Sequence, residues 1–312
     1  MDSEEHKDAE LMRKAMEGFG TDDSTLIEIT SKRNHKQRMK IRQAYKSIYG
    51  RDLIEDLKSD LSGYYQKIMI ALFTDPIEYD ADNLNDAMKG SGTDEDCLIE
   101  ILASRPGWYM NKIKKKYKEK YKKELEEDII GDTSGNFKKL LISLIQGNRS
   151  TNQTPDKDEC EKIANELYKG GEGKIGTDES LFNKYFSISS PHELLVIARE
   201  YHKLTGNLLT KAIDKEFSGD IKKLLKTILY AQISPSEYFA TRIREAVHGL
   251  GTNEKILNRI IVTRSEIDLP IIKQYYKQLY GKDMLKDIED DVSGDYKKLL
   301  LALCNQALVN FN

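Results

Sequence analysis

Four copies of one pattern run through the chain, and they limit its fold more than any other feature. A loop ending in Gly-Thr occurs as GFGT at 18–21, GSGT at 90–93, KIGT at 174–177 and GLGT at 249–252. An acidic residue follows each of these glycines by 40 positions, and a Ser-Gly pair begins two positions after the acid. The acids are Asp60, Asp132, Glu216 and Asp291. A fixed period of this kind indicates equivalent units that pack on one another.

The copies divide the chain into four predicted repeats. We place a short tail at 1–8, repeats at 9–75, 80–147, 159–232 and 236–312, and a linker at 148–158. The linker lies in the polar stretch GNRSTNQTPDKD and lengthens the middle step to 84 residues, against 72 and 75 for the other two. Its position favours two consecutive pairs of repeats, one before it and one after it.

Each repeat has a helical pattern almost throughout. Apolar residues at helical spacing follow the loop threonines, which are therefore predicted helix N-caps: Thr21, Thr93, Thr177 and Thr252. A longer amphipathic helix is expected to end at Gly50, Gly206 and Gly281, and at Lys122 in the second repeat. No alternating strand pattern of useful length occurs. The predicted fold class is all-α, with four homologous repeats of about five helices each.

Composition excludes several classes of function. The 49 basic and 52 acidic residues leave a net charge of -3, so no overall positive field favours nucleic acid. No apolar run is long enough to cross a membrane, and the first ten residues lack the pattern of a signal peptide, which predicts a cytoplasmic protein. The three cysteines are expected to be unpaired thiols. Nucleophile, zinc and phosphate-loop motifs are missing from the sequence, so we expect no enzyme activity.

The loop and the acid allow two interpretations. In a structural interpretation the glycines end one helix, the threonine caps the next, and the acid lies in the first turn of a later helix. That interpretation does not explain why the interval of 40 is kept in all four repeats. Calcium chemistry does explain it, because Ca²⁺ takes six to eight oxygens and a glycine loop can present several carbonyls to an ion beside one carboxylate.

Taken together, these features resemble the annexin family over essentially the whole chain. Further similar pieces are GDTSG at 131–135, VTRSEIDL at 262–269, and arginines 27 residues before the acid at Arg33, Arg105 and Arg264, where the third repeat has Ser189. The resemblance implies a slightly curved disc of four five-helix repeats. Its convex face would carry Ca²⁺ loops that dock reversibly on acidic phospholipid.

The resemblance also implies the ligands, which are three carbonyls and one carboxylate in each repeat. They are Met16, Gly18, Gly20 and Asp60; Met88, Gly90, Gly92 and Asp132; Gly171, Lys174, Gly176 and Glu216; Val247, Gly249, Gly251 and Asp291. Secondary ions, or simple dipole complementarity in a first helical turn, would account for four further acids: Asp23, Glu95, Glu179 and Glu254.

Between the loop glycines the sequence places Phe19, Ser91, Ile175 and Leu250. Three of these four are apolar and would anchor the loops among lipid head groups, unless they pack locally. We expect a monomer in solution that can assemble laterally on membranes, and recruitment to the membrane when calcium rises.

Two alternatives to membrane binding remain open. One is a calcium-responsive scaffold for a protein or nucleic-acid partner, although the lysine-rich stretch at 112–127 fits an ordinary helix with Ile113, Tyr117, Tyr121 and Leu125 on its apolar face. The other is ion conduction through a central polar pore, which the resemblance suggests from Asp80 and Arg105; for this pair a structural salt bridge is the favoured role.

Overall fold

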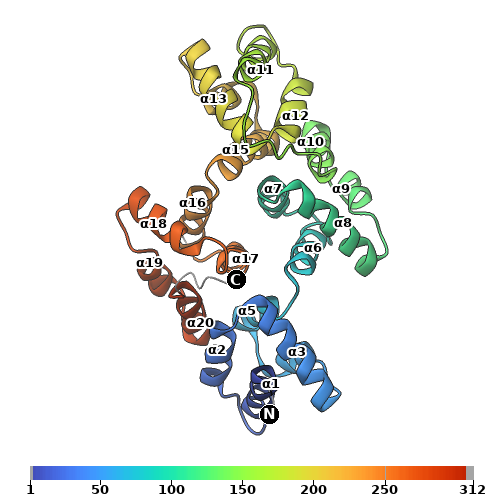
Figure 1. The fold of residues 1–312 in the computed structure, drawn as a ribbon, viewed down its shortest axis with the longest axis vertical. Helices are drawn as coiled ribbons and strands as arrows, with labels where there is room; N and C mark the ends of the chain where they lie inside the picture. The colour runs from blue at the N-terminus through green and yellow to red at the C-terminus, as the bar shows by residue number, and fades with distance from the viewer. Residues whose placement is uncertain (1–2, 250, 307–312) are drawn as a thin grey trace. The chain divides into compact units, whose positions relative to one another are not determined.

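The computed structural model describes residues 3–249 and 251–306, and in this part of the chain loops and turns connect α-helices (Figure 1). It contains twenty α-helices, five in each repeat, and no β-strand, which confirms the predicted fold class. The first two repeats consist of α1 (Glu4–Ala15), α2 (Asp23–Lys32), α3 (His35–Tyr49), α4 (Leu53–Asp60), α5 (Gly63–Leu72), α6 (Pro76–Ala87), α7 (Glu95–Ser104), α8 (Gly107–Tyr121), α9 (Leu125–Asp132) and α10 (Gly135–Ile145). The last two consist of α11 (Lys157–Gly170), α12 (Glu179–Ile188), α13 (Pro191–Thr205), α14 (Leu209–Glu216), α15 (Gly219–Ile233), α16 (Pro235–Val247), α17 (Glu254–Arg264), α18 (Leu269–Tyr280), α19 (Met284–Asp291) and α20 (Gly294–Cys304).

The helices form two compact units that do not follow the order of the repeats. Unit 1 combines the chain up to residue 79 with the chain from residue 239, and unit 2 is 80–238. The first repeat therefore pairs with the fourth, and the second with the third. The linker at 148–158 lies inside unit 2, so the consecutive pairing inferred from the linker is wrong. Which repeats pair depends on which helix faces are complementary, and a linker's position does not report that.

In unit 1 the second and fifth helices of both repeats share a core. Helix α2 packs against α20, and α5 packs against α17 (Figure 1). Leu26, Ile68 and Leu299 are completely buried there. Polar contacts join the same two repeats, since the buried Arg38 guanidinium contacts Glu266 at 2.5 Å.

Unit 2 repeats this arrangement with the equivalent helices of its own two repeats. Helix α7 packs against α15, and α10 packs against α12 and α15. The Gln232 side chain donates a 2.6 Å hydrogen bond to the carbonyl of Ala103, and Lys223 forms an ion pair with Asp96. Each unit thus buries apolar faces that a single repeat would leave exposed.

The ends of the third helices confirm the predicted glycine stops. Gly50, Gly206 and Gly281 cap α3, α13 and α18 in the left-handed conformation, with φ of 66°, 73° and 65°. Lys122 takes the same role after α8 with a φ of 58°, the one positive φ at a non-glycine residue in the described part of the chain. The local backbone of the repeat is therefore kept even where glycine is lost.

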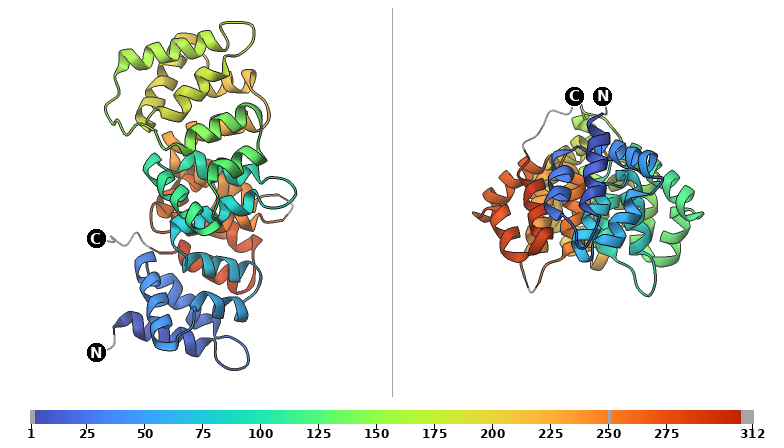
Figure 2. Two further views of the ribbon diagram at one scale, coloured as in Figure 1. Left: turned by 90° about the vertical axis from the view of Figure 1, so that its right-hand side faces the viewer. Right: turned by 90° about the horizontal axis from the view of Figure 1, so that it is seen from below.

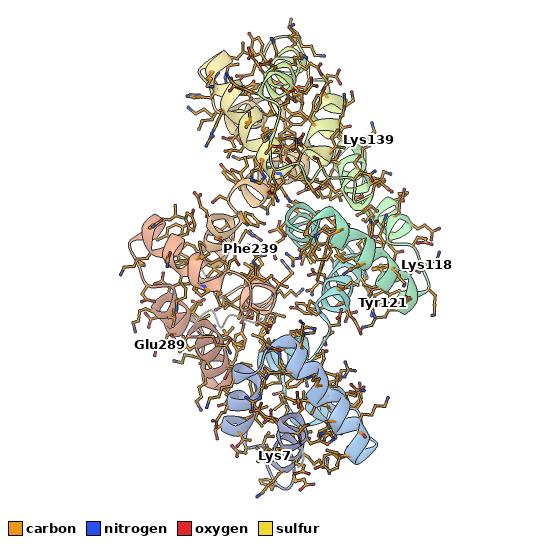
Figure 3. All side chains as sticks on the ribbon, viewed as in Figure 1. Lys7, Lys118, Tyr121, Lys139, Phe239 and Glu289 are labelled. Carbon is orange, nitrogen blue, oxygen red and sulfur yellow. The ribbon has the colours of Figure 1, made fainter. Side chains whose placement is uncertain are left out.

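Helix α8 has the amphipathic faces expected of an ordinary surface helix. Ile113 and Tyr117 are fully buried, Lys118 is exposed, and the Tyr121 hydroxyl donates a 2.5 Å hydrogen bond to Asp82 (Figure 3). Leu125 is also buried, but it begins α9 instead of continuing α8.

The family-like arginines hold helix ends to their own repeats. Arg33 forms hydrogen bonds of 2.6 and 3.2 Å to Asp8, and Arg105 forms 2.7 and 2.9 Å bonds to the buried Asp80. Arg105 and Asp80 therefore form a structural salt bridge, which is the role favoured for this pair from the sequence. In the third repeat, where Ser189 replaces the arginine, Arg149 of the linker donates to the carbonyls of Ser189 and Phe186 at 2.6 and 2.8 Å.

No helix in the described ranges combines the length and the apolar character required to cross a bilayer.

Candidate calcium-binding loops

The predicted carbonyl ligands lie in the loops that join the first helix of each repeat to the second. We call these the first loop (16–21), second loop (88–93), third loop (171–177) and fourth loop (247–252). Residue 250, and with it the predicted apolar anchor Leu250, lies outside the described residues. The first and second loops extend beyond the ends of their helices (Figure 2).

Three of the loops close in the same way. The backbone N–H of Asp22 donates to the carbonyl of Ala15 at 2.8 Å, and the equivalent bonds from Asp94 to Ala87 and from Asn253 to Ala246 have the same length. The residue after each of these alanines is buried, with Met16, Met88 and Val247 exposed by only 8%, 9% and 7%. Burial of this side chain anchors the start of the loop, so valine and methionine serve equally well.

Both glycines of the first loop require a backbone that other residues rarely adopt. Gly18 has a φ of 96° and Gly20 a φ of 89°. A Cβ added at either position would meet no atom within 4 Å. Glycine is therefore needed here for its backbone freedom and not for lack of space. The second and fourth loops share this feature, with φ of 98° and 94° at Gly90 and Gly92 and 148° and 86° at Gly249 and Gly251.

The four predicted carboxylate ligands occupy the last residue of the fourth helix in their repeats, not the first turn of a following helix. They end α4, α9, α14 and α19. A carboxylate at a helix C-terminus opposes the helix dipole, at a typical cost of about 0.3–1 kcal/mol. The structural interpretation, which placed these acids in the first turn of a later helix, is thus wrong. Stabilisation of a helix does not explain why an acid occurs at this position.

Three of the four loop threonines donate hydrogen bonds to these acids instead of capping helices. Thr252 Oγ1 donates to Asp291 Oδ2 at 2.6 Å, Thr177 Oγ1 to Glu216 Oε2 at 2.5 Å, and Thr93 Oγ1 to Asp132 Oδ2 at 3.2 Å. The helix N-caps are the next residues: Asp22, Asp94, Asp178 and Asn253. Hydrogen bonds from Ser24 and Thr25 lower the pKa of the Asp22 carboxyl to about 2, as expected for a capping carboxylate.

The predicted caps are wrong because threonine and the aspartate or asparagine that follows it are both good caps. The sequence signal that distinguishes them is the constant spacing of threonine and acid, 39 residues in every repeat.

The first repeat arranges these groups differently. Asp60 accepts a 2.9 Å hydrogen bond from Ser59 Oγ. Thr21 and Asp60 line a cavity of about 490 Å³ in unit 1, together with Asp291 of the fourth repeat. Two of the predicted secondary acids, Asp23 and Glu254, line the same cavity.

These two secondary acids also begin α2 and α17, where a carboxylate suits the helix dipole. Burial, and secondarily the charge of Asp295, raise the pKa of the Asp23 carboxyl. Across the described ranges, no three His, Cys, Asp or Glu side chains gather closely enough to hold a metal ion by themselves. A cation at a loop would therefore depend on backbone carbonyls beside its single carboxylate.

The third loop departs from the other three. It is one residue longer, because the Asp178 N–H closes on the carbonyl of Gly170 at 2.6 Å, eight residues back instead of seven. Gly176 alone keeps a positive φ, 81°. The predicted ligand carbonyl of Gly171 accepts a 3.1 Å hydrogen bond from the N–H of Lys174, also a predicted ligand. Glu216 still lies at hand, since an added Cβ on Gly171 would be 3.4 Å from its Cγ.

Two loops present apolar side chains with nothing covering them. Phe19 and Ile175 have relative exposures of 111% and 105%, so they do not pack locally. Ser91 of the second loop is also exposed. Fully exposed large apolar residues are uncommon on soluble surfaces unless they contact something else.

Comparison with known proteins places the chain in one family. The annexin family model matches residues 7–72, 79–144, 163–228 and 238–303. Annexin A11 of Oryctolagus cuniculus is 46% identical over 298 residues, covering 96% of this chain and 59% of the relative, so the chain spans about three-fifths of that protein.

Solved structures agree. Annexin III superposes with a TM-score of 0.96 at 40% identity, covering 98% of this chain and 95% of the other. A calcium-bound annexin, annexin (Sm)1, superposes with a TM-score of 0.86 at 32% identity, covering 97% and 90%. Four matched repeats, full-length structural agreement and recurring glycine loops lead to one conclusion: the chain belongs to the annexin family.

Proposed function

We propose that this protein binds acidic phospholipid membranes reversibly when Ca²⁺ occupies its loops. The observation that carries the proposal is the carboxylate at a helix C-terminus, which in three repeats accepts a hydrogen bond from the threonine of the glycine loop. This pairing holds an exposed or half-exposed anion beside a glycine loop. Annexins as a family bind phospholipid in a calcium-dependent way, and the structure of one relative, annexin (Sm)1, is of its calcium-bound form.

The residues present fit such an ion. In the first, second and fourth loops, the carbonyls of Met16, Gly18, Gly20 and of their equivalents would supply three oxygens. The carboxylates of Asp60, Asp132 and Asp291 would supply the charge, and Thr93 and Thr252 would orient two of them. The third loop would use Gly171, Lys174, Gly176 and Glu216. A bound Ca²⁺ with only these ligands keeps coordination positions that lipid phosphate or carboxylate oxygens can fill.

The small negative charge of each site, one carboxylate, predicts a weak intrinsic affinity for Ca²⁺. One carboxylate does not neutralise a divalent cation, so binding without lipid should be weak and binding with anionic lipid much stronger. The four sites would then act together, because docking one loop raises the effective concentration of the others at the same surface.

The exposed apolar residues support the membrane as the partner. Phe19 and Ile175 project from loops that would also hold a cation, and an apolar side chain beside such a charge fits the boundary between head groups and acyl chains. A protein or nucleic-acid partner is the alternative. The ordinary amphipathic character of α8 gives no support to nucleic acid, and the Asp80–Arg105 pair is satisfied without any pore.

We further propose a cytoplasmic, non-enzymatic monomer that moves to membranes as calcium rises. Cosedimentation with phosphatidylserine and phosphatidylcholine vesicles tests the function. With calcium the protein should pellet with the phosphatidylserine vesicles, and with EGTA it should stay in the supernatant. Equal pelleting in both conditions, or no preference for the anionic vesicles, would contradict the proposal.

A further inference from the structure

The third loop carries a partly buried carboxylate of its own, Glu172. Its side chain is only 11% exposed. It accepts hydrogen bonds from Tyr201 Oη on α13 at 2.8 Å and from Lys215 Nζ on α14 at 2.6 Å. Asn207 Nδ2, between these helices, lies 3.4 Å from it. One loop residue thus contacts both helices that lead to the acid Glu216.

Tyr201 has an equivalent in every repeat, a fully buried tyrosine 15 residues before the acid. In the other repeats its hydroxyl donates to an aspartate one turn before the acid. These bonds are Tyr45 to Asp56 at 2.6 Å, Tyr117 to Asp128 at 2.5 Å and Tyr276 to Asp287 at 2.6 Å. The third repeat has the buried Ala212 at the aspartate position.

Two departures of the third repeat therefore compensate for each other. The loop gains one residue, and α14 lacks the aspartate that would satisfy Tyr201. Glu172 supplies the missing carboxylate from the loop, and a buried tyrosine hydroxyl is costly to leave without a partner. The repeats differ in which segment supplies the carboxylate that accepts from the tyrosine. In the other repeats it is the fourth helix, whereas in the third repeat it is the loop that would hold the cation.

We propose that Glu172 is a positioning residue that fastens the third loop to α13 and α14, so that cation binding at this loop depends on that attachment. The inference rests on the proposed function of the loop. Glu172 directly follows Gly171, where an added Cβ would lie 3.4 Å from Glu216 Cγ. Holding Glu172 in place therefore constrains the spacing between the predicted carbonyl of Gly171 and the carboxylate. At the position of Glu172, 44 residues before the acid, the other three repeats have the buried apolar residues Met16, Met88 and Val247. In the second and fourth loops the contact with the acid-bearing helix comes instead from the threonine at the other end of the loop.

The test isolates the third loop in the full-length protein. Asp60, Asp132 and Asp291 are changed to alanine together, and Ca²⁺ binding to the remaining site is measured by calorimetry. In this background Glu172→Ala should weaken binding by about 10-fold to 100-fold, the usual effect of removing an outer-shell support of a metal site. Asp128→Ala is the matched control, because it deprives Tyr117 of the equivalent partner in the second repeat and should leave this affinity unchanged.

A rescue variant separates positioning from stability. Adding Ala212→Asp to Glu172→Ala gives Tyr201 a helix-borne partner, as in the other repeats. It should restore the unfolding temperature but not the calcium affinity. If both recover together, or if Glu172→Ala lowers only the unfolding temperature, the proposal is overturned. If Glu172→Ala does not fold, Glu172→Gln replaces it in the test. This variant loses the ion pair with Lys215 but keeps a hydrogen-bond acceptor for Tyr201. An unchanged calcium affinity in Glu172→Gln would contradict the proposal.

The experiments distinguish an error in the proposed function from an error in the role of Glu172. If the parent protein binds no vesicles with calcium, the proposed function itself is wrong. If the parent binds but the background with only Glu216 binds no Ca²⁺, the third loop is not a site and the role of Glu172 is overturned alone.

Discussion

Thr252 Oγ1 donates a 2.6 Å hydrogen bond to Oδ2 of Asp291, which ends a helix 39 residues later. The same hydroxyl lies 3.1 Å from the Asp291 carbonyl, so a single side chain contacts both the acid and the end of α19. The second repeat has the same pair of contacts at 3.2 Å each. A threonine thus connects each of these loops to its acid across the repeat.

Removing this hydroxyl should weaken calcium-dependent binding. Thr252→Val keeps the shape of the side chain but cannot hold Asp291 toward the loop. We expect the calcium needed for half-maximal vesicle binding to rise about threefold to tenfold, matching a hydrogen bond of roughly 0.7–1.4 kcal/mol. Thr21→Val is the matched control, because Asp60 accepts its hydrogen bond from Ser59 and should respond less. Equal effects of the two variants would contradict the orienting role.

The backbone of the second loop gives a separate prediction. Gly92→Ala places a Cβ where φ is 94°, although nothing within 4 Å obstructs it. The loop conformation should become less favourable by about 1–2 kcal/mol, which raises the calcium requirement. Gly131→Ala controls for the substitution, since Gly131 lies inside α9 without a positive φ and should be neutral or slightly stabilising. Vesicle titration and thermal unfolding report the two effects, and identical calcium curves for the variants would exclude backbone preorganisation.

The acid sensitivity of the fold should depend in part on Asp56, a buried aspartate that accepts a hydrogen bond from Tyr45. Hydrogen bonds from Arg51, together with Tyr45, lower the pKa of the Asp56 carboxyl. A lowered folded-state pKa gives stability that is complete above the unfolded value near 4 and lost as pH falls through the folded value. Asp56→Asn should therefore lower the free energy of unfolding by about 1–3 kcal/mol at pH 7.

The same variant should lose part of the acid sensitivity of the parent. Urea unfolding between pH 7 and pH 2.5 measures both curves. The difference between parent and variant should shrink as pH falls below 4. A difference that stays constant over this range would mean that the Asp56 charge does not contribute.

The exposed apolar residues should contribute to vesicle affinity but not to calcium binding in the absence of lipid. Phe19→Ser with Ile175→Ser removes two side chains that touch little of the protein. Vesicle affinity should fall roughly fivefold per residue, about 1 kcal/mol each for partial burial in the head-group region. Calcium binding without lipid and the unfolding temperature should not change. Ser91→Leu is the complementary gain, and unchanged vesicle affinity in both variants would exclude an anchoring role.

Much of the fold could be predicted from the sequence because helix formation here is local. Apolar spacing and the stops at Gly50, Gly206 and Gly281 indicated the helices, and even Lys122 was placed correctly. The pairing of repeats could not be predicted. It depends on contacts such as α2 with α20, which are far apart in the chain, and the linker suggested a different pairing.

The candidate site was predictable in its residues but not in their roles. The acid ends one helix and stands three residues before the next, so its position relative to a helix dipole is ambiguous in the sequence. Thr252 and Asn253 are both acceptable caps, and only the fold shows which of them turns toward the acid. The role of Glu172 could not be predicted, because its partners Tyr201 and Lys215 are 29 and 43 residues away in the sequence.

The last prediction concerns how the four sites share the work. Asp60→Ala removes the only predicted carboxylate of the first site and should raise the calcium requirement modestly, since the other loops still dock. Changing Asp60, Asp132 and Asp291 together should nearly abolish vesicle binding, because modest affinities multiply when sites engage one surface. Glu216→Ala alone should matter less than Asp60→Ala, since the third loop has one positive-φ glycine where the others have two.

Helix content must be measured as a control for these variants. The positions of the acids predict that the variants keep their helices. All four end helices, so removing a carboxylate relieves an unfavourable dipole interaction and should leave circular dichroism unchanged or slightly increased. Loss of binding in a fully helical triple variant would then reflect the sites themselves. A folded triple variant that binds phosphatidylserine vesicles at the calcium concentration of the parent would show that these carboxylates are not the ligands.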